Sequence, residues 1–306
     1  ISEKMEKLLY KYRNGNADVE IYDDGTRVIE FEDDLRLEFP LNIDIRVSSQ
    51  CSFGQKADGS PGFCTFCHEM AKVNGKECNY NQLLHKLDGL PKGIELAVGS
   101  NTFTDGLFDF LKSCKERGYI CNVTVNQGHL KRDFDKIKEA IRLDYIKGLG
   151  ISYRSSLKWD VPEEILNYEN VVFHVIAGID DIDDVKLLAD KGVKKILILG
   201  EKDFGYNYGK VDLNSEKHKR WRWFLRGLLD LFDVVSFDNL SLLQLKPERF
   251  MSKKHFEEFN QGEHSIYINA VDGYFAPSSR SFQKQDWNTI SVSNYFRDLE
   301  DYRENV

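Results

Sequence analysis

The stretch IDIRVSSQCSFGQKADGSPGFCTFCHEM, residues 43–70, decides which fold the sequence predicts. It starts as a short apolar strand over 43–48 and continues into a segment rich in Gly, Ser and Pro. That segment carries Cys51, Cys64 and Cys67 in a C-x12-C-x2-C spacing, and its composition predicts an irregular loop. Closely spaced thiols in a loop at the end of a strand are typical of a metal site.

Short apolar strands recur after this stretch about every 25 residues, which is the length of one βα unit. Helical patterns between them end at Gly118 and Gly192, and each glycine is a suitable C-cap. The strands near 171–177 and 194–200 are almost continuously apolar, as expected in a parallel sheet covered on both faces. The predicted fold class is parallel α/β, with six strands: 43–48, 94–99, 120–125, 145–152, 171–177 and 194–200.

The regions on either side of this series predict two smaller units. Apolar residues at helical spacing from Met5 to Tyr12 predict an opening helix, and Asp24-Gly25 predicts a β-hairpin. The basic, aromatic-rich run 217–226 predicts an amphipathic helix rather than a phosphate site, and Asp272-Gly273 predicts a second hairpin. We therefore expect a helix and hairpin cap over 1–40, a β/α core over 41–210, and a C-terminal helix and hairpin extension over 211–306.

The composition of the 306 residues excludes several classes of protein. No apolar run reaches the twenty or so residues of a membrane span, and the charged start is unlike a signal peptide, so a cytoplasmic location is expected. The net charge of −8 disfavours binding to extended nucleic acid. In a reducing compartment, six cysteines favour metal binding, catalysis or burial over disulfides.

Periodicity alone does not separate a closed barrel from an open doubly wound sheet. The cysteine segment does, because three thiols after the first strand, with Phe66 before the last thiol, resemble the radical S-adenosylmethionine enzymes. The commonest spacing in that family is C-x3-C-x2-C, whereas the first gap here is twelve residues. Longer gaps occur in some branches, including certain 7-carboxy-7-deazaguanine synthases. The resemblance covers about residues 41–200 and implies a partial (β/α)6 TIM-like barrel.

The resemblance also implies the cofactors. Cys51, Cys64 and Cys67 would hold a [4Fe-4S] cluster, and the methionyl group of S-adenosyl-L-methionine would chelate the fourth iron. Reductive cleavage would then give a 5′-deoxyadenosyl radical that abstracts hydrogen from a substrate. The electron would come from a donor such as flavodoxin or ferredoxin.

The family's S-adenosylmethionine contacts lie at the carboxyl ends of successive strands. Family members often carry a Gly-Gly-Glu run after the second strand, of which only the first glycine is present here. Ser152 and Arg154 share one face of the fourth strand, where the resemblance implies contacts to the ribose and the carboxylate. The implied cofactor contacts, with Phe66, are Gly99, Ser100, Asn101, Asn126, Ser152, Arg154, Ile176, Gly178 and Leu199.

Two alternatives remain open at this point. His68 could complete a Cys3His zinc site in a non-catalytic binding protein, although such sites usually show two close ligand pairs. For the enzyme, a small-molecule or nucleotide-like substrate is slightly favoured over a peptide. No cysteine follows Cys121 to hold an auxiliary cluster, and no separate peptide-recognition domain is evident.

Other candidate residues have plainer interpretations. Cys78, Cys114 and Cys121 are expected to be small buried hydrophobes. His174 is expected to be a hydrogen-bonded core residue, although it shares its strand face with Ile176 and Gly178. Asp44 and Arg46 alternate with apolar residues, so they are suited to lining a lumen, although a buried mutual ion pair is the plainer expectation. His68 and Glu69 are equally suited to facing a cavity and to capping a short helix.

Overall fold

The computed structural model describes residues 6–100, 102–259 and 264–304, and its main element is a ten-stranded sheet. The strand order is β11-β10-β9-β8-β7-β6-β4-β12-β13-β14. Every pairing from β11 to β12 is parallel, and β13 and β14 follow antiparallel. These strands are β4 (Asn42–Arg46), β6 (Glu95–Gly99), β7 (Ile120–Asn126), β8 (Gly148–Ser152), β9 (Val171–Ile176), β10 (Lys195–Leu199), β11 (Val234–Phe237), β12 (Ser265–Asn269), β13 (Tyr274–Ala276) and β14 (Gln285–Asp286).

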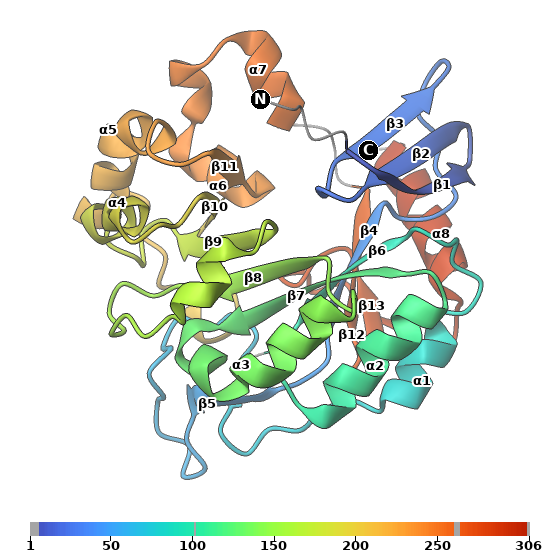
Figure 1. Cartoon of the computed structure of the whole chain (residues 1–306), viewed down its shortest axis with the longest axis horizontal. Coiled ribbons are helices and arrows are strands. Elements are labelled where there is room, and N and C mark those ends of the chain that lie inside the picture. Colours follow the sequence, from blue (N-terminus) through green and yellow to red (C-terminus); the bar gives the residue numbers. More distant parts are fainter. Residues whose placement is uncertain (1–5, 101, 260–263, 305–306) are drawn as a thin grey trace.

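Helices follow most of the parallel strands and lie along one side of the sheet (Figure 1). The predicted glycine caps are confirmed, since Gly118 and Gly192 follow α2 and α4 with φ of 80° and 89°. The helices are α1 (Tyr80–Lys86), α2 (Asp105–Glu116), α3 (Gln127–Arg142), α4 (Ile182–Asp190), α5 (Glu216–Leu229), α6 (Asn239–Leu245), α7 (Lys253–Phe259) and α8 (Val292–Glu304), with short 3₁₀ turns η1 (Glu163–Asn167), η2 (Gly205–Asn207) and η3 (Pro247–Phe250). No helix among the described residues is long and apolar enough to cross a bilayer.

The six predicted parallel strands are all present, and two more join them from the predicted C-terminal extension. Strand β11 pairs with β10 and β12 pairs with β4, so residues after 210 widen the sheet at both ends. The second predicted hairpin is β12 with β13. The sheet order runs from β11 to β14 without returning to its first strand, so within the described residues it is an open sheet and not a closed barrel.

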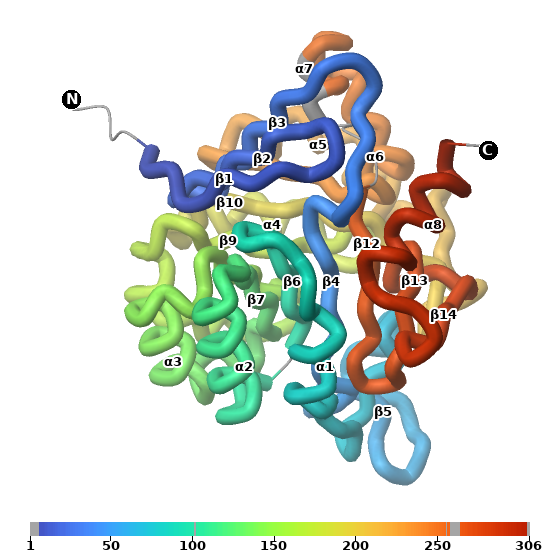
Figure 2. Tube along the Cα trace, turned by 90° about the vertical axis from the view of Figure 1, so that its right-hand side faces the viewer, coloured from blue at the N-terminus to red at the C-terminus, as the bar shows by residue number. Residues whose placement is uncertain are grey.

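A three-stranded antiparallel sheet forms the N-terminal unit: β1 (Leu8–Asn14), β2 (Ala17–Tyr22) and β3 (Arg27–Phe31). The hairpin predicted at Asp24-Gly25 joins β2 to β3. This sheet lies beside the start of β4 (Figure 2), where the Arg27 guanidinium donates to the Leu41 carbonyl at 3.1 Å. The N-terminal unit therefore borders the amino end of the first parallel strand.

The predicted opening helix is wrong for residues 8–12, which belong to β1. Met5, where that helix was expected to begin, lies outside the described residues. Aromatic residues favour strands, and Tyr10 and Tyr12 pack against Gly93, a contact that a side chain at Gly93 would prevent.

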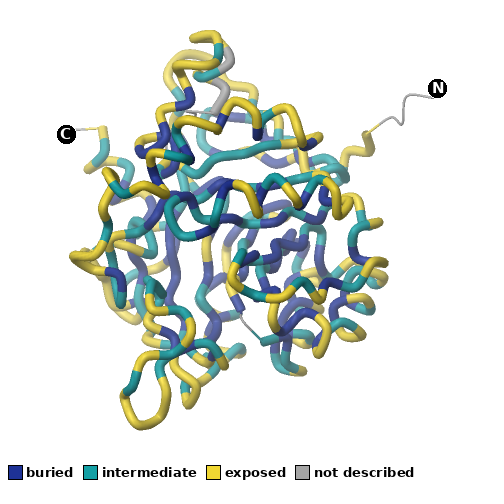
Figure 3. The backbone as a smooth tube through the Cα atoms, turned by 90° about the vertical axis from the view of Figure 1, so that its left-hand side faces the viewer, coloured by how far each residue is buried: buried dark blue, intermediate teal, exposed yellow. Residues whose placement is uncertain are grey.

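The two faces of the main sheet differ in chemistry, and this difference creates the site. Residues such as Ile43, Val123 and Ile198 are fully buried on the face covered by helices. Figure 3 shows buried residues concentrated in the interior strands and exposed ones in the outer loops. On the other face the alternate positions are polar or small, and a row of laterally paired residues runs across Asn126, Ser152 and His174. Strands β9 and β10, which are almost continuously apolar, are therefore tightly covered on one face only, and their other face borders cavities.

Candidate functional site

The cysteine segment begins with a strand instead of a wholly irregular loop. Cys51 is buried on β5 (Gln50–Gln55), and Cys64 and Cys67 lie in the turns that follow. The chain folds back on itself, because the Cys64 amide donates to the Phe53 carbonyl at 3.0 Å and the Cys67 amide donates to the Cys64 carbonyl at 3.2 Å. This fold brings two residues that are distant in sequence, Cys51 and Cys64, into one wall (Figure 2 shows the segment projecting from the sheet).

Glycines allow this close packing of backbone on backbone. A Cβ atom at Gly62 would collide with the Gly54 carbonyl, and one at Gly54 would collide with the Ala71 carbonyl. Gly205, at φ 62°, lies against the His68 carbonyl, and the neighbouring Tyr206 amide donates to the Cys67 carbonyl at 3.1 Å. The segment is thus held by β5 on one side and by η2 on the other.

The three thiols line one cavity of about 240 Å³, together with residues from the carboxyl ends of β7, β8, β9 and β10. Six of the ten predicted cofactor contacts line it. These are Phe66, Asn126, Ser152, Arg154, Ile176 and Leu199. We call this space the cysteine cavity.

The other predicted contacts lie apart from that lining. Gly99 ends β6, and the buried Ser100 hydroxyl donates to the Thr102 carbonyl at 2.7 Å. Gly178, at φ 91°, makes room for the His218 ring, which a Cβ atom would overlap. Asn101 falls outside the described residues.

Arg154 is the buried cation of the cysteine cavity. Its guanidinium lies 5.3 Å from the centre of the Phe66 ring and 3.3 Å from the Asp180 carboxylate, and it donates to the Tyr153 carbonyl. Asp180 is fixed in turn by the amides of Ile176 (2.7 Å) and Ser155 (3.0 Å). These contacts hold the guanidinium beside Cys64, whose thiol pKa burial raises to about 12 while the Arg154 charge opposes the shift.

His174 is a cavity residue, and the expected role of a hydrogen-bonded core residue is wrong, although its shared strand face with Ile176 is confirmed. It lines the cysteine cavity, and its ring has no hydrogen bond to another described residue. Burial, aided by the Arg154 charge, lowers the pKa of His174 to about 4, so the ring is neutral at physiological pH. Gly150 provides the space, because a Cβ atom there would lie 2.6 Å from His174 Cε1. The alternation of side chains along β9, which puts His174 on the face of Ile176, is the sequence signal for this position.

A charged network forms the wall beside the last cysteine. Glu69 accepts from Arg46 at 3.0 Å, His68 at 3.2 Å and the Tyr267 hydroxyl at 2.9 Å. Burial would raise the pKa of Glu69, but its hydrogen bond to His68 and the Arg46 charge outweigh this and hold it at about 2. The Lys202 ammonium lies 3.1 Å from His68 Nε2. His68 and Glu69 thus face the cavity, and the expected ion pair between Asp44 and Arg46 is wrong.

The predicted burial of the remaining thiols is confirmed for Cys114 and Cys121 but not for Cys78. Cys114 and Cys121 are buried and Cys78 is half-buried, and all six cysteines are free. Across residues 6–100, 102–259 and 264–304, no group of three or more His, Cys, Asp or Glu side chains is placed to hold a metal ion.

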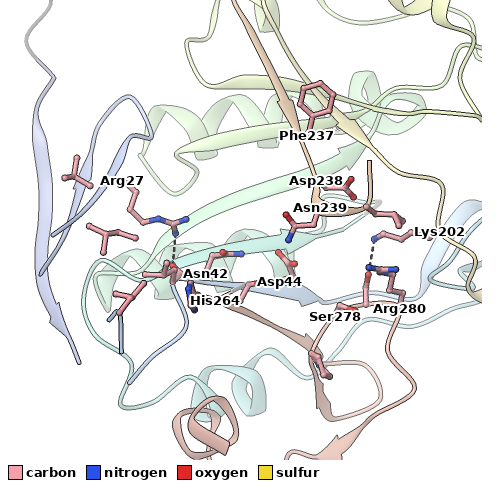
Figure 4. A pocket seen from close by; sticks show the side chains of 18 of the residues that line it. Arg27, Asn42, Asp44, Lys202, Phe237, Asp238, Asn239, His264, Ser278 and Arg280 are labelled. Atoms are coloured by element: carbon pink, nitrogen blue, oxygen red, sulfur yellow. Dashed lines mark hydrogen bonds between the residues drawn. The ribbon is translucent and has the colours of Figure 1, made fainter. Parts of the chain in front are cut away.

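A second, larger cavity of about 970 Å³ lies between β3, the start of β4 and β12, and the chain that follows β10, β11 and β13 (Figure 4). Lys202 lines both cavities, so they adjoin at this side chain. Asp44 points into the larger one and has no hydrogen bond or ion pair with another described residue. We call this space the large cavity.

Comparison with known proteins gives a structural likeness but no sequence match. No protein-family model and no curated protein match the chain. Three solved structures of Streptococcus suis SuiB resemble it, each at 12% identity and over 96% of this chain. They are SuiB itself (TM-score 0.63, 88% of that chain), SuiB bound to S-adenosylmethionine (0.61, 87%) and SuiB bound to the precursor peptide SuiA (0.62, 89%). The chain therefore shares the overall fold of these structures.

Proposed function

We propose that this chain is a radical S-adenosylmethionine enzyme. The observation that carries the proposal is the meeting of three thiols and a row of polar strand-end residues in one cavity at the carboxyl edge of a parallel sheet. That edge is where α/β folds bind ligands. The likeness to SuiB, one structure of which contains S-adenosylmethionine, supports it. The partial barrel of that enzyme class is part of the proposal.

The residues of the cysteine cavity suit the two cofactors. Cys51, Cys64 and Cys67 would hold a [4Fe-4S] cluster through three irons, because a cubane gives each thiolate its own iron and does not require one shared point. When bound, the cluster supplies the electron that splits S-adenosylmethionine and yields a 5′-deoxyadenosyl radical. Metal binding must displace the thiol protons, which burial otherwise retains on Cys51 and Cys64.

The side chains of this chain position the second cofactor. Arg154 presents a preformed guanidinium to a carboxylate, and Ser152 and Asn126 offer hydrogen bonds to a ribose. Ile176 and Leu199 provide apolar contact to a base, as does Phe66. Gly99, Ser100, Asn101 and Gly178 remain proposed contacts through their backbone, outside the lining of the cavity.

Two substrate classes remain. A small-molecule or nucleotide-like substrate fits the large cavity of about 970 Å³, which is within the size range of ligand pockets. A peptide substrate is favoured by one specific observation, the likeness to SuiB bound to its precursor peptide SuiA. The large cavity is lined in part by β3, which is an edge strand of the N-terminal sheet.

Anaerobic purification tests the proposal against the zinc-stabilised binding protein. We expect a brown protein with a cluster absorbance band that releases 5′-deoxyadenosine when S-adenosylmethionine and dithionite are added. A colourless protein that contains one zinc ion and gives no 5′-deoxyadenosine would exclude the enzyme.

An acidic electron-transfer protein such as flavodoxin or ferredoxin is the proposed partner. The outer surface of the cysteine segment carries the exposed lysines Lys56, Lys72 and Lys76, although the chain as a whole has a charge of −8. Exposed Met70 and Val73 lie between them in sequence. Exposed lysines on the cysteine segment, next to the proposed cluster, favour docking of an acidic donor.

Reversing these three charges to Glu is expected to slow S-adenosylmethionine cleavage at least about tenfold with reduced flavodoxin at low salt, because electrostatic attraction governs the encounter. Cleavage with dithionite, a small reductant, should be unchanged. The matched control reverses Lys112, Lys194 and Lys219, which are exposed on other elements. Equal loss in both triple variants would contradict a specific docking surface.

A further inference from the structure

One corner of the large cavity gathers two cations and two hydroxyls. Lys202 follows β10, and Ser278, Ser279 and Arg280 follow β13. Figure 4 shows Lys202, Ser278 and Arg280 close together at one end of the cavity, with Asp44 nearer its centre. Segments separated by more than seventy residues therefore converge on this corner.

Lys202 is held in place but is not neutralised. Its ammonium donates to Ser279 Oγ at 3.0 Å and lies 3.1 Å from His68 Nε2. No carboxylate of the described residues lies within ion-pair distance of it. The ammonium group is thus oriented at the junction of the two cavities with capacity for a further acceptor.

Arg280 adds a second cation without a partner. Its side chain lines the large cavity, and it makes no hydrogen bond or ion pair with a described residue. Two neighbouring cations repel each other unless an anion lies between them. A guanidinium is suited to bidentate contact with a carboxylate or phosphate.

Two acids line the same cavity, but neither forms an ion pair with Lys202 or Arg280. Asp238 Oδ1 already accepts from the amides of Gly200 (3.0 Å) and Ser241 (2.7 Å), the second of which belongs to the first turn of α6. Burial raises the pKa of Asp44, although the Lys202 charge opposes the shift. The corner consequently keeps free hydrogen-bond donors on two cations, because neither acid pairs with Lys202 or Arg280.

We propose that Lys202, Ser278, Ser279 and Arg280 bind an anionic group of the substrate, a carboxylate or a phosphate, and so orient the substrate in the large cavity beside the cysteine cavity. The role in substrate binding rests on the proposed function, but the anion site itself does not. Charge-assisted hydrogen bonds from an ammonium and a guanidinium give both affinity and orientation to such a group. The same corner would serve a free small molecule or the acidic group of a peptide.

Isothermal titration calorimetry of the anaerobically purified protein in low-salt buffer, with inorganic phosphate and with acetate as separate probes, tests this site. We expect one site that binds at least one of the two probes, and the tighter probe indicates the class of group. Arg280→Met should weaken that binding at least about tenfold, the effect of losing a charge-assisted contact. Because the Arg280 side chain is exposed and has no partner among the described residues, its replacement should not impair folding. An unchanged melting temperature checks this.

Lys284→Met is the matched control, since Lys284 is also exposed and near in sequence but contacts the Tyr274 ring outside the cavity lining. It should bind both probes as the unmodified enzyme does. Binding of neither probe would overturn the inference, and so would equal affinity in Arg280→Met, which indicates an adventitious ion only. Failure of the proposed function is seen separately, as loss of the cluster band and of 5′-deoxyadenosine release while anion binding persists.

Discussion

Cys64→Ala is expected to remove the brown colour and S-adenosylmethionine cleavage together. A site-differentiated cubane needs three thiolates, and Cys64 lies with Cys51 and Cys67 in the wall of the cysteine cavity. Removing one ligand leaves an iron without its protein anchor, so we expect nearly complete loss of bound iron and sulfide and no 5′-deoxyadenosine. Iron analysis, the absorbance band and chromatography of the reaction products measure these quantities.

Cys114→Ala is the matched control for this prediction. Cys114 is a fully buried thiol on α2, outside both cavities. Its replacement should cost roughly 1 kcal/mol of stability through lost packing, with the colour and the cleavage rate retained. Loss of the cluster in both variants would show that the colour reports folding rather than ligation at Cys64.

Much of the central fold follows from local pattern, and the parts that the sequence does not reveal depend on pairing over long distances. Six strands are indicated by apolar runs between helical segments. Strand β11 and the pairing of β12 with β4 are not indicated, because partners far away in sequence leave no local signal. Strand β1 was predicted as a helix because a short apolar run fits both periods; its pairing with β2 decides the outcome.

The residues of the site also fall into those that the local sequence indicates and those that it does not. Residues at strand ends, such as Asn126, Ser152 and Arg154, could be found because parallel strands present their carboxyl ends along one edge. The strand face of His174 could be predicted from alternation, but not that its ring lacks a hydrogen-bond partner among the described residues. No sequence motif marks Lys202, and its position where the two cavities meet is seen only in the structure.

Asp180→Ala is expected to destabilise the protein much more than Cys114→Ala or Arg280→Met does. Asp180 is 1% exposed, pairs with Arg154 at 3.3 Å and accepts from the amides of Ile176 and Ser155. Its removal leaves a buried guanidinium without a counter-charge and two amides without an acceptor, at a cost of about 3–5 kcal/mol. The melting temperature should fall by roughly 6 °C or more, as measured by circular dichroism.

Two further variants separate the buried charge from the mere loss of a contact. Arg154→Met with Asp180→Leu removes both charges, so it should be markedly more stable than Asp180→Ala, because no buried charge is left unpaired. Asp183→Ala breaks the exposed pair with Arg220, and its melting temperature should change by about 2 °C or less. If the double variant is as unstable as Asp180→Ala, the amide contacts of Asp180 and not its charge hold this wall together. Arg154 would then be free to turn toward a cofactor carboxylate without weakening the fold.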